Sequence, residues 1–191
     1  MTRKTKSQEK LLYSARNLFF AKGYLNTSID DIVQNIGMSK ATLYRHYKTK
    51  EDLLKAVAEV FYGDIREFIG KIASENIEFP QKLEEFILYL SFRLKEVNPA
   101  LLKDLQITEP FLYQFICEER ATTIEVQLKS LLSQGIEQGA INPEFNINLV
   151  VGLILSSIER MSSPALMEKT GMTYDRIFRQ VVAIITKGIC Q

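Results

Sequence analysis

Hydrophobic residues recur every three or four positions along almost the whole chain, which is the spacing of amphipathic α-helices. In residues 7–22, for example, Leu11, Ala15 and Phe19 fall on one helical face. No segment alternates between apolar and polar residues over the length of a strand. The pattern therefore predicts an all-α protein.

About nine helices are expected. Helix boundaries are inferred from capping residues, glycines and prolines, and all five prolines, beginning with Pro80, are expected near breaks in the helical pattern. The other four are Pro99, Pro110, Pro143 and Pro164. The expected helices cover residues 7–22, about 28–36, 39–47, 49–74, 81–97, a short stretch after 99, 110–138, 145–161 and 173–189.

Two of these helices are very short and are joined by a glycine. The first has apolar residues at Ile29, Ile32, Val33 and Ile36, and Thr27 and Ser28 each have an aspartate three residues later, as a capping box requires. Gly37 can adopt the left-handed conformation of a tight turn, and Ser39 can cap the next helix. Two short helices around such a turn are typical of a helix-turn-helix that binds DNA.

The second short helix, residues 39–47, has two different faces. Leu43 and Tyr47 are four residues apart and are expected to hold the helix to a small core. The opposite face, which is expected to meet DNA, consists of Ala41, Thr42, Tyr44 and Arg45.

The side chains on and beside this helix suit nucleic-acid recognition. Ala41 can approach a thymine methyl group, and Arg45 and Lys40 can donate to guanine. Lys40 and Lys50 lie in the first turns of their helices, where a cation is unfavourable unless a phosphate is bound there. The residues expected at phosphates are Ser28, Tyr44, His46 and Lys50.

Charge is distributed unevenly along the chain. The net charge is only +1, but residues 1–56 carry 11 Lys/Arg against 5 Asp/Glu, whereas residues 57–191 carry 13 against 18. A basic segment attached to an acidic one is consistent with a polyanion bound at one end, and equally with a solvated surface. We therefore expect a DNA-binding domain at 1–56 and a helical ligand-binding and dimerisation domain at 57–191.

The last two expected helices are apolar around much of their circumference. They could form a homodimer interface as a four-helix bundle, with Gly152 permitting close approach, or could simply lie in the core. The residues expected at a dimer interface are Val150, Val151, Ile154, Ile158, Ile177, Val181 and Ile185.

Residues 57–191 contain nine Phe and four Tyr, on helices that could surround a cavity. Such aromatic stripes are commonly core residues, but a cavity lined by them would take a mostly apolar small molecule. The acidic balance of this region favours a neutral or cationic one. The candidate pocket residues are Phe61, Phe68, Phe86, Tyr89, Leu90, Phe111 and Phe115.

The N-terminal segment resembles the DNA-binding head of the tetracycline-repressor (TetR) family of bacterial regulators. The matching residues are Gly23-Tyr24, Thr27-Ser28, Asp31-Ile32, Gly37, Ser39, Thr42–Tyr47 and Lys50–Leu54, whereas Val33 and Ile36 stand where the family usually has alanines. The resemblance implies a homodimeric repressor of a double-stranded DNA operator, released by a small effector. It also implies phosphate contacts at Tyr44, His46 and Lys50 and a recognition helix at Ser39–Tyr47, and we add Thr27 to the expected DNA-contacting residues.

Two other classes of function compete with a DNA-binding regulator. An enzyme is disfavoured because His46 is the only histidine and no metal-binding, nucleotide-binding or phosphate-loop motif occurs, so no catalytic residue, cofactor or metal is expected. An architectural DNA-binding protein without an effector remains an alternative. The sequence has no signal peptide or membrane span, and two isolated cysteines, Cys117 and Cys190, so a cytoplasmic protein is expected.

Overall fold

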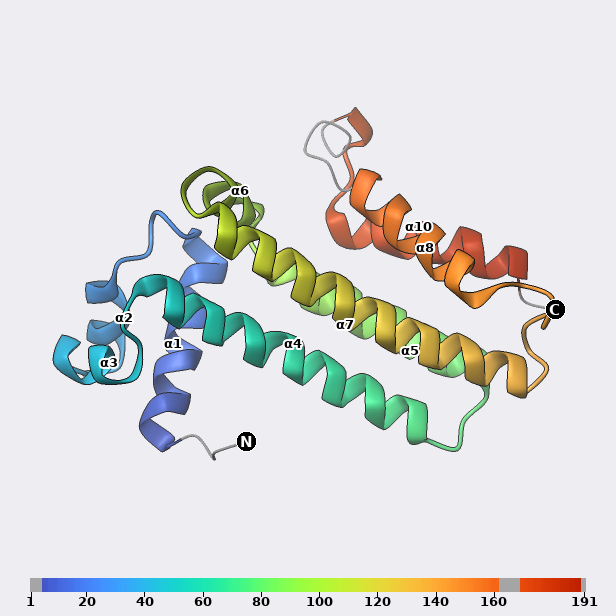
Figure 1. Cartoon of the computed structure of the whole chain (residues 1–191), viewed down its shortest axis with the longest axis horizontal. Coiled ribbons are helices and arrows are strands. Elements are labelled where there is room, and N and C mark those ends of the chain that lie inside the picture. The colour runs from blue at the N-terminus through green and yellow to red at the C-terminus, as the bar shows by residue number, and fades with distance from the viewer. Residues whose placement is uncertain (1–4, 162–168, 190–191) are drawn as a thin grey trace. The chain divides into compact units, whose positions relative to one another are not determined.

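The computed structural model describes residues 5–161 and 169–189, and the expected all-α class is confirmed. In this part of the chain nine α-helices are present (Figure 1). They are α1 (Lys6–Lys22), α2 (Ile29–Asn35), α3 (Lys40–His46), α4 (Lys50–Ser74), α5 (Phe79–Lys95), α6 (Pro99–Thr108), α7 (Pro110–Glu137), α8 (Ile147–Met161) and α10 (Tyr174–Ile189).

The helices pack into two units. Unit 1 comprises Met1–Gly63 and Glu96–Arg120, and unit 2 comprises Asp64–Lys95 and Ala121–Gln191. Helices α4 and α7 each contribute residues to both units.

Several helix boundaries differ by one or two residues from those expected, and local hydrogen bonds explain the differences. Helix α1 begins at Lys6 because Thr5 and Gln8 form a capping box. Helix α5 begins at Phe79 and includes Pro80, which is tolerated because the first-turn N–H groups have no helical partner. Helix α8 begins after Asn146, whose Oδ1 accepts from the N–H groups two and three residues later, at 3.0 and 3.3 Å. Pro164 lies outside the described residues.

Unit 1 is built around the apolar face of α1. Leu11, Ala15 and Phe19 are fully buried, and α1 contacts both α2 and α6. Phe20 meets the ring of Phe61 edge-on, with the ring centroids 5.1 Å apart. Figure 1 shows α1, α2 and α3 gathered at the start of α4, so the short helices rest on a compact apolar support.

Helix α6 is joined to the C-terminal end of α1 and the turn after it by backbone and side-chain hydrogen bonds. The Asn98 backbone N–H donates to the Phe20 carbonyl at 3.0 Å, and its side-chain amide donates to the Ala21 carbonyl at 2.9 Å. The backbone N–H of Leu25 donates to the Asp104 carboxylate at 3.0 Å. These bonds satisfy polar groups that the end of α1 would otherwise leave without partners.

In unit 2, α10 packs against α5 and α8, with Phe86 and Phe178 fully buried. Lys82 is also buried, and its ammonium donates to the Ala73 carbonyl at 2.7 Å and to Gln134 Oε1 at 3.1 Å. A buried lysine is stable only when such acceptors replace its water. Lys82 therefore ties the end of α4 to α5 and α7.

Most of the residues predicted from the sequence for a dimer interface are buried within one chain. The side chains of Val150, Val151, Ile154, Ile177 and Val181 are at most 6% exposed, because α8 and α10 turn these faces towards each other and towards α5. The side chains of Ile158 and Ile185 lie outside the described part of the structure.

The exposed apolar residues of these two helices lie on other faces. They are Leu149 and Leu153 on α8, 64% and 52% exposed, and Ile184 on α10, 71% exposed. Gly152 is exposed between the two leucines. Among the residues described, no helix combines enough length with enough apolar character to cross a bilayer.

Candidate nucleic-acid interface

The turn between α2 and α3 has the geometry expected from its sequence. Gly37 has φ +64°, the left-handed conformation that glycine adopts without a Cβ clash. The Gly37 N–H donates to the Gln34 carbonyl at 3.2 Å, and the Met38 N–H donates to the Val33 carbonyl at 2.9 Å. This pair of bonds is a Schellman motif, which ends α2 and redirects the chain into α3.

The two short helices are capped by the predicted serines. Ser28 Oγ accepts from the Asp31 N–H at 3.1 Å while the Asp31 carboxylate accepts from the Ser28 N–H at 2.9 Å and its hydroxyl at 2.7 Å. These hydrogen bonds from Ser28 lower the pKa of the Asp31 carboxyl. Ser39 Oγ accepts from the Thr42 N–H at 3.2 Å and so begins α3.

Helix α3 presents the predicted faces. Leu43 is fully buried and Tyr47 is half-buried, and this burial raises the pKa of the Tyr47 phenol. The side chains of Ala41, Tyr44 and Arg45 are exposed. The core contact thus leaves an exposed strip that combines a small residue, a phenol and a guanidinium.

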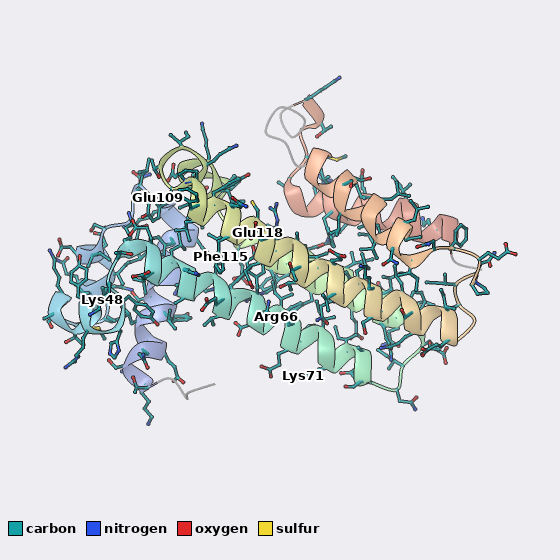
Figure 2. All side chains as sticks on the ribbon, viewed as in Figure 1. Lys48, Arg66, Lys71, Glu109, Phe115 and Glu118 are labelled. Atoms are coloured by element: carbon teal, nitrogen blue, oxygen red, sulfur yellow. The ribbon has the colours of Figure 1, made fainter. Side chains whose placement is uncertain are left out.

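Two further polar side chains near α3 differ in their environments. The His46 side chain at the end of α3 is half-exposed. Lys48 is exposed on the loop that joins α3 to α4 (Figure 2).

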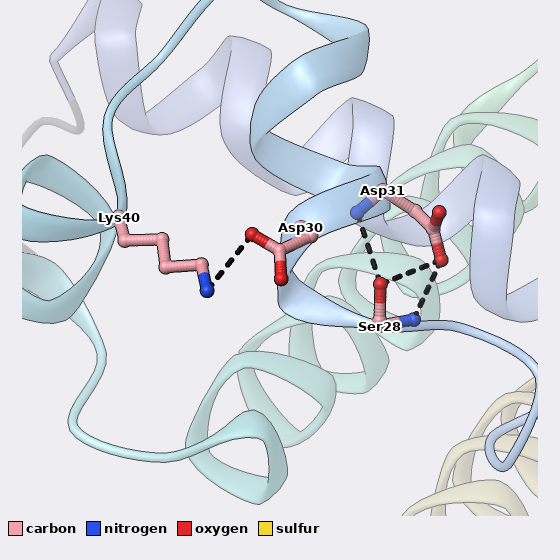
Figure 3. A network of polar contacts seen from close by, with 4 residues as sticks. All are labelled: Ser28, Asp30, Asp31 and Lys40. Atoms are coloured by element: carbon pink, nitrogen blue, oxygen red, sulfur yellow. Dashed lines mark hydrogen bonds and ion pairs between the residues drawn. The ribbon is translucent and has the colours of Figure 1, made fainter.

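Lys40, the first residue of α3, is paired with an acidic residue of α2. Its Nζ lies 2.9 Å from Asp30 Oδ1, and the two side chains are 54% and 53% exposed (Figure 3). The hydrogen bond to Asp30 raises the pKa of Lys40. Sequence reasoning anticipated a cation at the start of α3 but not its internal counterion.

Lys50 is held within unit 1. Its Nζ donates to the Tyr24 carbonyl at 2.7 Å and lies 3.9 Å from the centroid of the Tyr24 ring. Burial lowers the pKa of Lys50. The Tyr24 hydroxyl in turn donates to Glu51, and burial followed by this bond raises the pKa of the phenol. A phosphate would therefore have to share or displace the bond from Lys50 to Tyr24.

Thr27, which the sequence analysis included among the expected DNA-contacting residues, is held within unit 1. Its side chain is fully buried, and the hydroxyl donates to the Gly23 carbonyl at 2.8 Å and lies 3.2 Å from the Leu18 carbonyl. Of the two capping-box candidates, Ser28 is the one that caps α2. The Thr27 hydroxyl secures the end of α1 instead.

Sequence reasoning missed a surface hollow of about 450 Å³ beside α3. It lies between the first residues of α1, including Lys6 and Lys10, and the turn around Gly37, and it extends to Ser39 and Thr42. The signal in the sequence was a pair of lysines four residues apart at the start of α1.

The candidate effector residues are distributed over both units. In unit 1, Phe61 is buried against Phe20, whereas Phe111 is 88% exposed and so does not line a closed cavity. Phe115 lies on α7 (Figure 2) and is half-buried. Lys55 Nζ lies 4.5 Å from its ring centroid.

In unit 2, Phe86 and Leu90 are buried in the core. Phe68, 37% exposed, stacks on Tyr89 with the ring centroids 3.7 Å apart. The burial of these candidate residues is that of an aromatic core with a few rings at the surface. They remain predictions as pocket residues.

A short capped helix that exposes basic and small side chains beyond a glycine turn defines a helix-turn-helix DNA-binding protein. A family model described as "Bacterial regulatory proteins, tetR family" matches residues 11–57. These N-terminal residues therefore belong to the TetR family of helix-turn-helix transcriptional regulators, as their resemblance predicted, and that family consists of regulators rather than enzymes.

Curated relatives agree with this assignment. The uncharacterized HTH-type transcriptional regulator YvaF of Bacillus subtilis is 26% identical over 189 residues, covering 95% of this chain and 94% of the relative. The biofilm operon icaADBC HTH-type negative transcriptional regulator IcaR of Staphylococcus epidermidis is 29% identical over 89 residues, covering 47% of this chain and 48% of the relative.

Solved structures share the fold. A transcriptional regulator from Cytophaga hutchinsonii has a TM-score of 0.76 at 18% identity and covers 98% of this chain and 100% of its own. The regulator FadR from Bacillus subtilis in complex with stearoyl-CoA has a TM-score of 0.69 at 20% identity, covering 95% of this chain and 98% of its own.

Proposed function

We propose that this regulator is a homodimeric repressor that binds a palindromic operator and is released from it by a small, mostly apolar effector. Residues 1–56 would bind DNA, and residues 57–191 would bind the effector and the second subunit. The observation that carries the DNA-binding part is the exposure of Ala41, Tyr44 and Arg45 opposite the buried Leu43. IcaR, described as a negative regulator, supports repression as the direction of control.

Within this proposal the residues of α3 and those beside it have distinct roles. Arg45 and Lys40 donate to guanine in the major groove, and Ala41 contacts a thymine methyl group. Tyr44, His46, Ser28 and Lys50 fix the helix on the phosphates, with Ser39 and Thr42 beside them. In a dimer the recognition helices are paired, so the half-sites would lie one helical turn, or a multiple of it, apart.

Selection of bound fragments from random DNA tests the DNA-binding role. The full-length chain should enrich a palindrome, and Arg45→Ala should change which bases are preferred. Lys48→Ala, which removes a neighbouring exposed cation outside α3, should weaken binding without changing the preference. If the chain enriched no sequence, or if Arg45→Ala selected the same palindrome with the same stringency, the proposed role of α3 would be wrong.

The dimer proposal rests on the exposed apolar residues of α8. Leu149 and Leu153 are separated by about one helical turn, and Gly152 between them permits a close approach of two backbones. Leu153→Glu should give a monomer by sedimentation at micromolar concentration. Ile107→Glu, which charges a residue 73% exposed on α6, should leave the dimer intact. A wild-type monomer would contradict the proposal.

The effector proposal rests on the aromatic composition of residues 57–191 and on FadR, whose structure holds stearoyl-CoA. A long acyl chain fits the expected apolar character of the ligand. Release of operator DNA should be measured by fluorescence anisotropy with stearoyl-CoA, with stearate and with coenzyme A alone. Release by the acyl compounds but not by coenzyme A would support an apolar effector. Release by coenzyme A without an acyl chain would contradict an apolar effector.

A further inference from the structure

The hollow beside α3 brings together two segments that are far apart in the sequence. It has a volume of about 450 Å³ and is lined by Lys6, Ser7 and Lys10 of α1 and by Ile36, Gly37, Met38, Ser39 and Thr42 of the turn and α3. No acidic side chain is among its lining residues. The hollow therefore combines two lysines and three hydroxyl-bearing residues with two apolar side chains, Ile36 and Met38.

Lys6 and Lys10 differ from the lysines that the sequence pointed to. Lys40 is paired with Asp30, and Lys50 donates to the Tyr24 carbonyl. Within the described part of the chain, neither Lys6 nor Lys10 has a hydrogen-bond or ion-pair partner through its ammonium group. The ammonium groups of Lys6 and Lys10, at the start of α1, can therefore bind an anion without first losing a partner in the described part of the chain.

The position of Lys6 is also unfavourable in the isolated protein. It is the first residue of α1, where a positive charge opposes the helix macrodipole. Lys10 is four residues later, so both side chains project from the same helical face. An anion bound in the hollow would be attracted by both ammonium groups and would remove this unfavourable interaction.

We propose that this hollow binds the sugar–phosphate backbone of the operator, at phosphates that flank the groove entered by α3. The inference rests on the proposed DNA-binding function and adds a phosphate-binding site formed by Lys6, Lys10 and Ser7. The hollow is continuous with the proposed interface because Ser39 and Thr42 belong to both. Lys6 and Lys10 supply the complementary charge.

The local geometry leaves room for a backbone. An ideal Cβ placed on Gly37 would have no heavy atom within 4 Å, so the surface of the turn is open on that side. A neutral apolar ligand would strip water from the lysines and hydroxyls without replacing their hydrogen bonds. A phosphodiester would replace those hydrogen bonds and bring a negative charge to pair with the two ammonium groups.

Salt-dependent binding by the full-length chain tests the site. Lys6→Gln and Lys10→Gln, singly and together, are compared on the operator obtained by selection and on an unrelated duplex of equal length. A dimer carries two copies of each lysine, so each single substitution should reduce the slope of log K against log salt by about 1.8. Affinity at 0.1 M salt should fall more than about tenfold on both duplexes, without a change in sequence preference.

Two controls separate this site from a general charge effect and from a free-phosphate site. Lys71→Gln removes one positive charge from an exposed ion pair in unit 2 and should leave the slope unchanged. Inorganic phosphate at equal ionic strength should not compete with the duplex for the hollow. Ethylation interference should show that the double variant loses contacts to flanking phosphates while the central ones stay.

The outcomes of this experiment are separable. If the double variant binds with the wild-type slope and wild-type phosphate contacts while Arg45→Ala loses sequence preference, the hollow is not a DNA site and the proposed function stands. If inorganic phosphate competed with the duplex, and Lys6→Gln abolished this competition, the hollow would be a site for a small phosphate ligand. That result would overturn the inference. A wild-type chain that binds no duplex would overturn both the inference and the proposed function.

Discussion

The ammonium group of Lys40 lies 2.9 Å from a carboxylate oxygen of Asp30, so the first residue of α3 is ion-paired to the first turn of α2. Both side chains are about half exposed, and an ion pair in that setting is weak and screened by salt. A guanine or a phosphate can therefore compete with Asp30 for Lys40. The carboxylate also repels the DNA that Lys40 would attract.

Asp30→Asn is expected to raise the affinity for DNA, most clearly for duplexes without the operator. The substitution removes a negative charge from the interface and frees Lys40 to bind any phosphate it reaches. Binding should be measured by fluorescence anisotropy at several salt concentrations, on operator and non-operator duplexes. Discrimination between the two duplexes should decrease.

A double-mutant cycle tests whether Lys40 mediates this effect. Asp30→Asn and Lys40→Met should be non-additive, because each alters the same ion pair. Glu9→Gln makes the same charge change on α1 and should be additive with Lys40→Met. Weaker binding of Asp30→Asn to every duplex would show that Asp30 supports binding rather than opposing it.

The pKa of Asp31 predicts a pH-dependent contribution to stability. Hydrogen bonds from Ser28 lower the pKa of the folded carboxyl below its ordinary value of 3.8. The carboxylate therefore stabilises the fold above the unfolded pKa, and this contribution is lost as the pH falls through the lower, folded pKa. In urea denaturation, wild type should exceed Asp31→Asn in free energy of unfolding at pH 6, and the difference should shrink as the pH falls through the lowered, folded pKa of Asp31.

A difference between wild type and Asp31→Asn that persisted unchanged to low pH would mean that the charge of Asp31 has no part in the cap. Ser28→Ala removes the reciprocal hydrogen bonds and should cost about 1 kcal/mol at neutral pH.

Lys50→Met should destabilise the protein as well as weaken DNA binding. The methionine keeps much of the side-chain volume but loses the hydrogen bond to the Tyr24 carbonyl, at an expected cost of about 1–2 kcal/mol. Lys48→Met removes an exposed lysine two residues away and should change the free energy of unfolding by less than about 0.5 kcal/mol. Equal stability of the two variants would contradict an internal role for Lys50.

Gly135→Ala should destabilise unit 2 by about 1–3 kcal/mol. An ideal Cβ at this position would lie 2.7 Å from Phe79 Cε2 and 2.8 Å from Ile141 Cδ1, both in side chains that are themselves buried. Gly70→Ala is the matched control, since a Cβ on this glycine of α4 meets no heavy atom within 4 Å. Thermal unfolding should show a lower midpoint for Gly135→Ala only, and equal midpoints would mean that the core accommodates the methyl group.

The sequence by itself determined the helices and the helix-turn-helix. Caps and turns depend on hydrogen bonds between residues two to five positions apart, such as Ser28 with Asp31 and the Schellman bonds around Gly37. Helical periodicity likewise placed Leu43 in the core and Arg45 on the surface. These features follow from local geometry, which a sequence specifies directly.

Tertiary structure alone decided which of several suitable surfaces each side chain meets. Val150 and Ile177 suited a dimer interface or a core, and they lie in the core because α8, α10 and α5 pack together within one chain. Thr27 is buried at the C-terminal end of α1, where its hydroxyl bonds to the carbonyls of Leu18 and Gly23. The Lys50 ammonium donates to the carbonyl of Tyr24, 26 residues earlier. Such contacts depend on where distant segments meet in space, and hydrophobic periodicity identifies an apolar face without identifying its partner.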